Sequence, residues 1–394
     1  MTDSLPEGAD RPGSEPGRSL LSDGSMSPAW ADTFDAVPRA LFAPDIVWSH
    51  DMASGRSVVA DRRTDPAGWV EAIDANVPLV TQWDDGTHRG TDPGTVATSS
   101  ISMPSLVASM LRDLDVRPGM KVYEGGTGPG WNAALLAHRL GSAQVVSVEY
   151  DEEVSKAARI NLARAGLRPE LVIGDGAAGW SRGGPYDRAI FTYGLRAIPA
   201  PVVRQVHAGG MILAPWGTDF TALDAVVKLT VNDDGSVSGP FTQMVEFMKS
   251  RNQRLEFPQH SAYVPDFPGD ADTSCITALM PEDLGGYWDV RRFSLGLAVP
   301  DATHVVHQQD DGTTSAWFYG LTDRSWAAVV RREGDAVGSV YQSGPRQLWP
   351  AVERALDWWQ GQGRPSLERF GLSVINGSHT TWLDTPDNVV PTYR

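Results

Sequence analysis

The glycine-rich stretch at residues 122–136, VYEGGTGPGWNAALL, constrains the fold of this chain more than any other segment. Four of its glycines fall within the six residues 125–130, after an apolar run and before a helix-like one. Glycine lets the main chain turn sharply and lets a ligand approach the backbone, because it has no side chain to obstruct either. A strand, a bare turn and a helix in this order predict the start of a βαβ unit, with the turn as the floor of a nucleotide site.

The segments after this turn continue the alternation of strands and helices. The predicted helices are 104–114, 131–140 and 152–165, and the predicted strands are 121–123, 144–149, 171–173, 188–192 and 211–215. Asp151 is the expected cap of the third helix. An antiparallel hairpin follows, formed by VVKLTVNDDGSV and TQMVEFM. Alternation at this spacing predicts an α/β fold, a Rossmann-like and mostly parallel sheet with helices on both faces.

Composition and pattern divide the chain into three parts. Residues 1–28 are rich in Pro, Gly, Ser and acids and predict a disordered tail. Residues 29–255 carry the alternating pattern and form the predicted first domain. Residues 256–394 alternate apolar and polar residues between turns, which predicts a smaller C-terminal α+β domain. Its helix PRQLWPAVERALDWWQ places Leu348, Val352, Leu356 and Trp359 on one apolar stripe, whereas Trp349 and Trp358 lie off the stripe and are expected to be exposed.

Charge and cysteine content argue against several classes of function. A formal net charge of −16 disfavours nucleic acid as a partner, because phosphate binding needs clustered Lys and Arg. No apolar run is long enough to span a bilayer, so no membrane partner is expected. Cys275, the single cysteine, cannot form an internal disulfide, and the N-terminus lacks a secretory pattern, which predicts a cytoplasmic location. The eight histidines have no ligand spacing, so no metal is expected.

The glycine stretch also narrows the choice of cofactor. Residues 124–130 fit E-x-G-x-G-x-G, which resembles the first motif of S-adenosylmethionine-dependent methyltransferases and differs from the dinucleotide pattern G-x-G-x-x-G. This donor carries a sulfonium and an ammonium but no pyrophosphate, so an acid at the strand end, Glu124, suits it. Glu149, roughly twenty residues beyond the loop, is expected to hold the ribose hydroxyls, and Asp175 to accept from the adenine amino group. The candidate cofactor-binding residues are Glu124, Gly126, Thr127, Gly128, Gly130, Glu149, Tyr150, Asp175, Gly176 and Thr192. A packing turn flanked by surface carboxylates is the alternative.

Longer segments carry a more specific resemblance. In order and spacing, SSISMPSLVASML, VRPGMKVYEGGTGPGWNAALLA, VSVEYDEEVSKAARINLARAG, VIGDGAAGW and PYDRAIFTYGLRAIPAPVVRQVHAGGMILAPWG resemble protein L-isoaspartyl O-methyltransferases, and VPRALFAP fits that family's VPR-x-x-F segment. The resemblance implies that the loop at residues 100–104 carries the serine that contacts the substrate carboxyl. Ser102 is the candidate, with Ser100 beside it, and capping of the following helix is the alternative role for Ser102. The segment between VPRALF and SSIS is longer than in the family, which predicts a remodelled substrate entrance.

The second domain shapes the hypotheses about substrate. The two-domain layout ending in GRPSLERFGLSV and TWLD resembles the methyltransferases of ribosomally made, post-translationally modified peptides such as lanthipeptides, lasso peptides and graspetides. The resemblance implies as substrate an L-aspartate in a cyclised precursor peptide, bound in part by the second domain, whose methyl ester closes to an aspartimide and can open to isoaspartate. Repair of isoaspartyl residues in damaged proteins is the first alternative, and a non-catalytic peptide-binding protein the second. A nucleic-acid amino methyltransferase is disfavoured, because FTYGLRAIP stands where an N-P-P-Y-like motif is expected.

Overall fold

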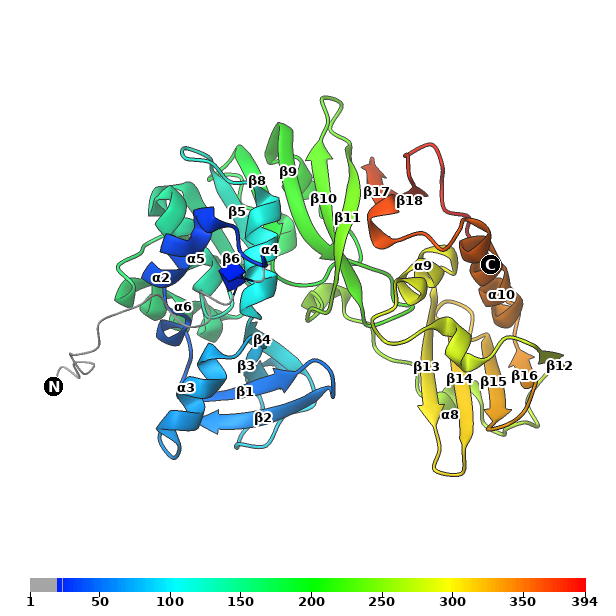
Figure 1. Ribbon diagram of the computed structural model, residues 1–394. Helices are drawn as coiled ribbons and strands as arrows, with labels where there is room; N and C mark the ends of the chain where they lie inside the picture. The colour runs from blue at the N-terminus through cyan, green and yellow to red at the C-terminus, as the bar shows by residue number, and fades with distance from the viewer. Residues whose placement is uncertain (1–19, 23) are drawn as a thin grey trace. The chain divides into compact units, whose positions relative to one another are not determined.

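The computed structural model describes residues 20–22 and 24–394 (Figure 1). Most of the predicted disordered tail, residues 1–19 and 23, lies outside this part of the chain. The chain forms two compact units, one with the residues up to Thr192 and Arg204–Leu213, the other with Tyr193–Val203 and Ala214–Arg394. The predicted domain boundary after residue 255 lies inside the second unit and stays a prediction. Within the described residues, no helix has both the length and the apolar character needed to cross a bilayer.

The first unit is built on a parallel sheet. Its strands are β5 (Val122–Gly125), β6 (Val145–Glu149), β7 (Glu170–Ile173), β8 (Tyr186–Phe191) and β9 (Val206–Trp216), whose last residues belong to the second unit. They lie in the order β9-β8-β5-β6-β7, and every neighbouring pair is parallel. This is the strand order of doubly wound α/β folds, and it places the topological switch point beside β5, where such folds bind ligands at the carboxyl ends of the strands.

Helices α4 (Pro104–Leu114), α5 (Trp131–Leu140) and α6 (Glu152–Arg164) flank these strands (Figure 1). The three predicted helices are confirmed almost to the residue. The Asp151 side chain accepts hydrogen bonds from two backbone N–H groups in the first turn of α6, as expected of its cap. Helix α5 follows the glycine loop directly, and its buried alanines and leucines let it pack closely on the sheet.

A second, antiparallel sheet lies in the first unit and was not predicted from the sequence. It contains β1 (Ile46–Asp51), β2 (Arg56–Asp61), β3 (Leu79–Trp83) and β4 (Ala97–Ile101), in the order β2-β1-β3-β4, with helix α3 (Pro66–Asp74) between β2 and β3 in the chain. Trp48, Val80 and Trp83 form its small buried core. Strand β4 ends at Ile101, so the predicted substrate loop begins within this sheet and continues directly from its last strand.

The second unit contains two groups of antiparallel strands. The predicted hairpin is confirmed as β10 (Asp224–Val231) and β11 (Val237–Val245), and β11 pairs with β17 (Phe370–Ile375), which pairs with β18 (Ser378–Leu383). A five-stranded sheet has the order β12-β16-β15-β14-β13. Its strands are β12 (Thr273–Thr277), β13 (Ala302–Gln308), β14 (Thr313–Gly320), β15 (Trp326–Arg332) and β16 (Gly338–Ser343). This unit also contains helices α7 (Ala200–Val203), α8 (His260–Tyr263), α9 (Val290–Ala298) and α10 (Leu348–Gly361), and the first unit also contains α2 (Ala31–Ala36).

Helix α10 has a wider buried face than its apolar stripe predicted. The four stripe residues are buried as expected, but Trp349 is only 2% exposed, so its predicted exposure is wrong. The reason is that α10 contacts α9 as well as strands β14, β15 and β16, and the Trp349 ring packs 5.7 Å from that of Phe318. Trp358 is partly buried.

Candidate functional site

The candidate site lies at the carboxyl ends of strands β5 to β8, all in the first unit. Backbone hydrogen bonds continue across these ends beyond the strands themselves. They join Thr192 N to Gly125 O (3.0 Å), Gly126 N to Val148 O (2.9 Å) and Gly174 N to Glu149 O (2.8 Å). The predicted cofactor residues, which follow four different strands in the sequence, are therefore held along one edge of the sheet.

The glycine loop between β5 and α5 has a backbone that favours glycine at three positions. Gly126, Gly128 and Gly130 have φ angles of 97°, 53° and 99°, in the left-handed region where other residues are strained. At Gly128 a Cβ atom would also lie 3.3 Å from the carbonyl oxygen of Ser100. The predicted cofactor loop and the predicted substrate loop are thus in close backbone approach, which a larger side chain would crowd.

Glu124 lies at the base of this loop and is fully buried. One carboxylate oxygen accepts a hydrogen bond from Asn132 Nδ2 at 2.7 Å, and the other accepts one from the Ser147 hydroxyl. Burial raises the pKa of Glu124 to about 7, against the lowering effect of these two donors, and nearby Glu149 raises it further. Near neutral pH the charged and neutral forms of the Glu124 carboxyl are therefore both populated.

Glu149, at the end of β6, holds the glycine loop through its backbone. Its Oε2 accepts from Gly128 N and its Oε1 from Asp151 N, both at 2.9 Å. A carboxylate oxygen carries two lone pairs and so accepts more than one hydrogen bond. The side chain of the neighbouring Tyr150 is 52% exposed, so it lies at the surface of the site.

The remaining candidate residues are placed by polar contacts with the loop and its surroundings. Asp175 accepts from Ala177 N at 2.9 Å and so forms the cap of a short turn that begins at Gly176. The hydroxyl of Thr127 lies 2.6 Å from that of Ser147, and the hydroxyl of Thr192 donates to the carbonyl oxygen of Gly126. Glu149 and Thr192 therefore contact the glycine loop itself, whereas Asp175 and Gly176 follow the end of strand β7, which pairs with β6. The role of all ten residues in binding a cofactor stays a prediction.

The predicted substrate loop follows strand β4. Ser100 pairs with Val80 in the antiparallel sheet, and Ser102 follows the last residue of the strand. The N-cap of helix α4 is Met103, and the Asn76 side chain accepts a hydrogen bond from Ser105 N in the first turn at 2.9 Å, so the alternative role of Ser102 as a helix cap is not supported. Ser102 is left as a candidate for contact with a ligand.

Several residues that shape the site were not singled out from the sequence. Asn132 and Ser147 supply the two hydrogen bonds to Glu124. Ser147 could have been noticed as a polar residue inside an otherwise apolar strand, VVSVE. Arg39, in the VPR segment, is buried and donates to carbonyl oxygens of residues 101 and 102. Its sequence signal was the VPR motif itself.

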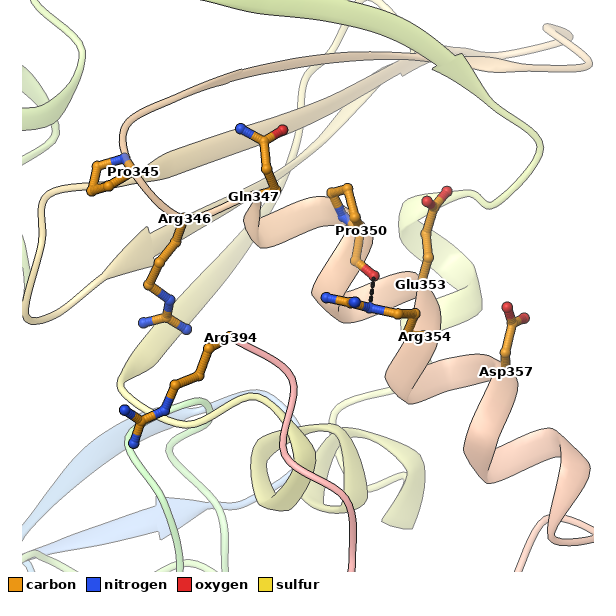
Figure 2. Close-up of a pocket in the computed structure, with 8 residues that line it drawn as sticks. All are labelled: Pro345, Arg346, Gln347, Pro350, Glu353, Arg354, Asp357 and Arg394. Carbon is orange, nitrogen blue, oxygen red and sulfur yellow. Dashed lines mark hydrogen bonds between the residues drawn. The ribbon is translucent and has the colours of Figure 1, made fainter.

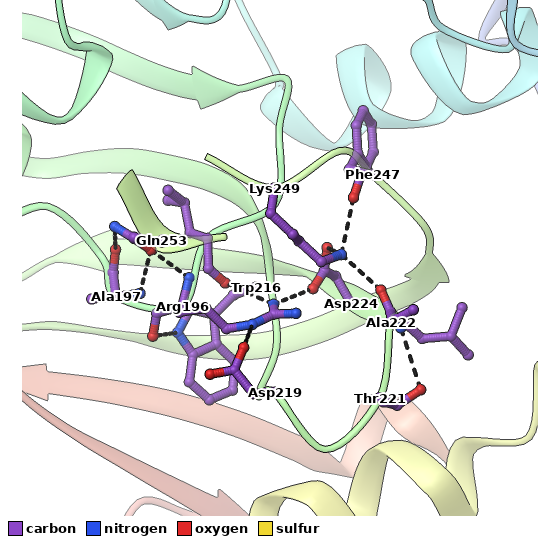
Figure 3. Close-up of polar contacts among 12 residues, drawn as sticks. Arg196, Ala197, Trp216, Asp219, Thr221, Ala222, Asp224, Phe247, Lys249 and Gln253 are labelled. Carbon is purple, nitrogen blue, oxygen red and sulfur yellow. Dashed lines mark hydrogen bonds and ion pairs between the residues drawn. The ribbon is translucent and has the colours of Figure 1, made fainter. Parts of the chain in front are cut away.

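Two polar regions of the second unit are alternative candidate sites. A cavity of about 550 Å³ is lined by Pro345, Arg346, Gln347, Pro350, Glu353, Arg354, Asp357 and Arg394 (Figure 2). Its lining includes three arginines and two acids, and the Arg346 guanidinium already donates to two backbone carbonyl oxygens. The second region is an ion cluster around Asp224 (Figure 3). Neither resembles a methyl-donor site.

Comparison with known proteins now identifies the family. Residues 87–254 match the family Protein-L-isoaspartate(D-aspartate) O-methyltransferase. Protein-L-isoaspartate O-methyltransferase 2 of Polaromonas sp. is 36% identical over 156 residues, which are 39% of this chain and 72% of that protein. The corresponding protein of Archaeoglobus fulgidus is 35% identical over 156 residues, 39% of this chain and 70% of that protein. The chain belongs to the protein-L-isoaspartate O-methyltransferase family.

The sequence similarity to a further relative covers about a third of this chain, whereas the similarity in fold to a solved structure covers nearly all of it. The protein-L-isoaspartate O-methyltransferase of Pyrococcus horikoshii is 39% identical over 142 residues, which are 36% of this chain and 64% of that protein. A solved structure titled protein-L-isoaspartate O-methyltransferase is similar over 94% of this chain and 99% of its own, with a TM-score of 0.52 and 21% identity. The predicted methyltransferase fold is thus confirmed, together with an additional C-terminal sheet region. The precursor-peptide variant of the family stays a prediction.

Proposed function

We propose that this chain is an S-adenosylmethionine-dependent O-methyltransferase that esterifies a side-chain carboxylate of an aspartate-derived residue in a peptide. One observation carries the proposal: Gly128 of the cofactor loop lies against the Ser100 carbonyl of the substrate loop, so that a Cβ there would be 3.3 Å away. A methyl donor on one loop and a carboxylate on the other would then be close enough to react. Family membership supports the same reaction class.

The residues present fit the donor. The three glycines with positive φ leave the backbone open to it, and Glu149 and Asp175 offer acceptor oxygens for ribose hydroxyls and an adenine amino group. When bound, S-adenosylmethionine supplies a methyl group on a positively charged sulfur. Glu124 is buried with hydrogen-bond donors that are neutral, so a cation nearby would favour its ionised form.

The chain's contribution to the reaction is mainly alignment. A substrate carboxylate is already anionic at neutral pH, so no general base is required. In the proposed reaction one carboxylate oxygen would take the methyl group as the carbon–sulfur bond breaks, which would give a methyl ester and S-adenosylhomocysteine. Ser102 would donate a hydrogen bond to the second carboxylate oxygen and hold the first on the line of attack. The expectation that no metal takes part stays a prediction.

For the substrate we propose an L-aspartate in a cyclised precursor peptide, processed in the cytoplasm, with residues 256–394 contributing to its recognition. Support comes from the resemblance of the two-domain layout to enzymes that modify ribosomal peptides. Esterification suits this role, because an alkoxide leaves far more readily than an oxide when the following backbone nitrogen attacks to form the aspartimide. The second candidate is repair of isoaspartyl residues, which the names of the family's members favour.

Methyl transfer from radiolabelled S-adenosylmethionine separates these candidates. The purified chain would be offered a generic isoaspartyl peptide, the same peptide with ordinary aspartate, and a cyclised peptide encoded beside its gene, in linear and cyclic forms. Transfer to the cyclic form, followed by loss of methanol, is expected. Transfer to the isoaspartyl peptide alone would reject the precursor substrate, and no binding of the donor by calorimetry would favour a non-catalytic peptide-binding protein.

The role of Ser102 can be tested in the same assay. Ser102→Ala should lower kcat/KM roughly 10-fold to 100-fold, the effect of losing a hydrogen bond to a charged group. The dissociation constant of S-adenosylmethionine should stay within about twofold of wild type. Ser105→Ala, at the second residue of α4, is the matched control and should change neither. An equal loss of donor binding in Ser102→Ala would contradict the assigned role.

A further inference from the structure

Arg39 makes an unusual set of contacts for an arginine outside the sheet. Its side chain is buried, and its two terminal nitrogens donate to five backbone carbonyl oxygens from two separate segments. Those acceptors are Ile73 (3.1 Å), Ala75 (3.1 Å), Val77 (2.7 Å), Ile101 (2.9 Å) and Ser102 (3.1 Å). Ile73 lies in the last turn of helix α3, and Ala75 and Val77 lie in the connection from α3 to strand β3. Ile101 ends β4, and Ser102 belongs to the predicted substrate loop.

We propose that Arg39 is a positioning residue that fixes the Ser100–Ser102 loop against the glycine loop. The proposal rests on the proposed function, because the loop it holds is the candidate carboxylate site. Residues 101 and 102 leave the edge of a small antiparallel sheet at this point, and their carbonyl groups would otherwise face the interior without donors. The guanidinium satisfies them and also ties them to the connection between α3 and β3.

The neighbours of Arg39 in the VPR segment extend this link to the glycine loop. The carbonyl oxygen of Val37 accepts from the indole nitrogen of Trp131 at 3.0 Å, and Trp131 is the first residue of α5 after the loop. The Arg39 guanidinium also lies over the Trp131 ring, 5.7 Å from its centroid. One short segment therefore contacts both loops whose separation would set the distance between donor and acceptor.

An arginine is required here for geometric reasons. Its planar group directs several N–H bonds outward at fixed angles, whereas a lysine has one nitrogen with three donors and cannot reach acceptors on two sides. Burial lowers the pKa of Arg39 to about 9, and the charge of Asp74 partly opposes this, so the side chain remains a cation at neutral pH. Arg39→Lys therefore keeps the charge and removes the geometry.

The matched control is Arg188, another buried arginine of the first unit. Its guanidinium donates to the carbonyl oxygens of Leu114 and Asp115, at the opposite end of helix α4 from the substrate loop. Burial lowers its pKa as well. Arg188→Lys should therefore reproduce the general cost of replacing a buried arginine, without disturbing residues 100–102.

A double-mutant cycle with Ser102→Ala tests the proposal. Arg39→Lys alone should lower kcat/KM by tenfold or more while the dissociation constant of S-adenosylmethionine changes less than twofold. In the Ser102→Ala background the same replacement should add less than a threefold further loss, because Arg39 acts through that serine. Arg188→Lys should change turnover little in either background. Losses that multiply for Arg39→Lys, or an unchanged kcat/KM, would overturn the proposal.

Hydrogen exchange of the backbone amides provides a measurement that needs no activity. Arg39→Lys should accelerate exchange at residues 99–103, and Arg188→Lys should not. Should Arg39→Lys fail to fold, Trp131→Phe loosens the same segment by removing the hydrogen bond to Val37 and part of the ring beneath the Arg39 guanidinium, and should accelerate exchange at the same residues. If wild type transfers no methyl group, the proposed function fails while this measurement still decides the role of Arg39. Unchanged exchange at residues 99–103 would reject it.

Discussion

Two fully buried carboxylates, one in each compact unit, are held in opposite ways. Glu124 in the first unit receives its hydrogen bonds from the neutral side chains of Asn132 and Ser147. Asp224 in the second unit receives hydrogen bonds from two cations, Arg196 and Lys249, each at 2.6 Å (Figure 3). The difference lies in the charge of the partners, since burial is the same.

This difference separates a structural charge from an adjustable one. The Asp224 cluster carries its own counter-ions: Lys249 also donates to the carbonyl oxygens of Ala222 and Phe247, and Arg196 also pairs with Asp219. Burial lowers the pKa of Lys249, Asp224 opposes that shift, and Arg196 adds to it. Glu124 instead has a pKa raised to about 7 and lies beside the loop proposed to bind a cationic donor. A bound cation would therefore stabilise the ionised form of Glu124, whereas Asp224 already has two cationic partners within the protein.

The largest effect is expected from Asp224→Asn. It leaves Arg196 and Lys249 buried without their shared anion, and removing one partner of a buried ion pair costs about 3–5 kcal/mol of unfolding free energy. Denaturant unfolding would measure the loss. Asp219→Asn is the control, because the Asp219 side chain is 32% exposed and pairs with Arg196 alone, so it should cost about 1 kcal/mol or less. Adding Lys249→Met to Asp224→Asn should recover part of the loss.

A smaller effect, dependent on pH, is expected from Glu124. The folded pKa of about 7 exceeds the ordinary value of 4.5, so the folded state binds the extra proton between these values. The stabilisation that Glu124 contributes is therefore complete below pH 4.5 and is lost as pH rises to about 7, by roughly 3 kcal/mol. Glu124→Gln imitates the protonated form and should remove this dependence, so the variant should exceed wild type in stability at pH 8.

The control for this experiment is Glu153→Gln on the surface of α6, whose side chain in wild type is 80% exposed. It should leave the pH dependence of unfolding unchanged. S-adenosylmethionine should reduce the pH dependence of wild type, since a cation near Glu124 favours the ionised form, and should have no such effect on Glu124→Gln. If the unfolding free energies of wild type and Glu124→Gln changed equally with pH, Glu124 would not be the adjustable charge that the comparison with Asp224 proposes.

The parallel sheet could be predicted because its signals are local. Asp151 as a helix cap, Gly141 after α5 and the apolar runs before each acid all act within a few residues, and each was found where expected. The carboxyl-end positions of Glu124, Glu149 and Asp175 followed from strand order alone. The directions of side chains such as Asn132 and Ser147 could not be predicted from the sequence, because they depend on how α5 and β6 pack against β5.

The antiparallel sheets were harder to predict because their pairing is not local. Strand β2 exposes Val58 and Val59, so its apolar residues carry no clear burial pattern, and the sheet around it was missed. Strand β17 pairs with β11, which lies more than a hundred residues earlier in the chain, so no local pattern indicates this pairing. The five acceptors of Arg39 are backbone groups, which leave no trace in the residue types at those positions.

The smallest effect is expected at Glu149, which accepts hydrogen bonds from the backbone amides of Gly128 and Asp151. Glu149→Gln leaves one acceptor oxygen for two N–H donors and turns an amide group toward the other. Losing one charge-assisted bond and its contact with the ribose should weaken S-adenosylmethionine binding by about 1–2 kcal/mol, or roughly fivefold to thirtyfold.

Calorimetry with Glu149→Gln and, as control, Glu152→Gln on the exposed first turn of α6 would measure this difference. The Glu149 variant should lose donor affinity but little unfolding free energy, whereas Asp224→Asn should lose stability but no affinity beyond what unfolding explains. If Glu149→Gln instead destabilised the fold as strongly as Asp224→Asn with unchanged affinity, Glu149 would be a loop anchor only. The acidic edge of the first sheet would then share the structural character of the ion cluster in the second unit.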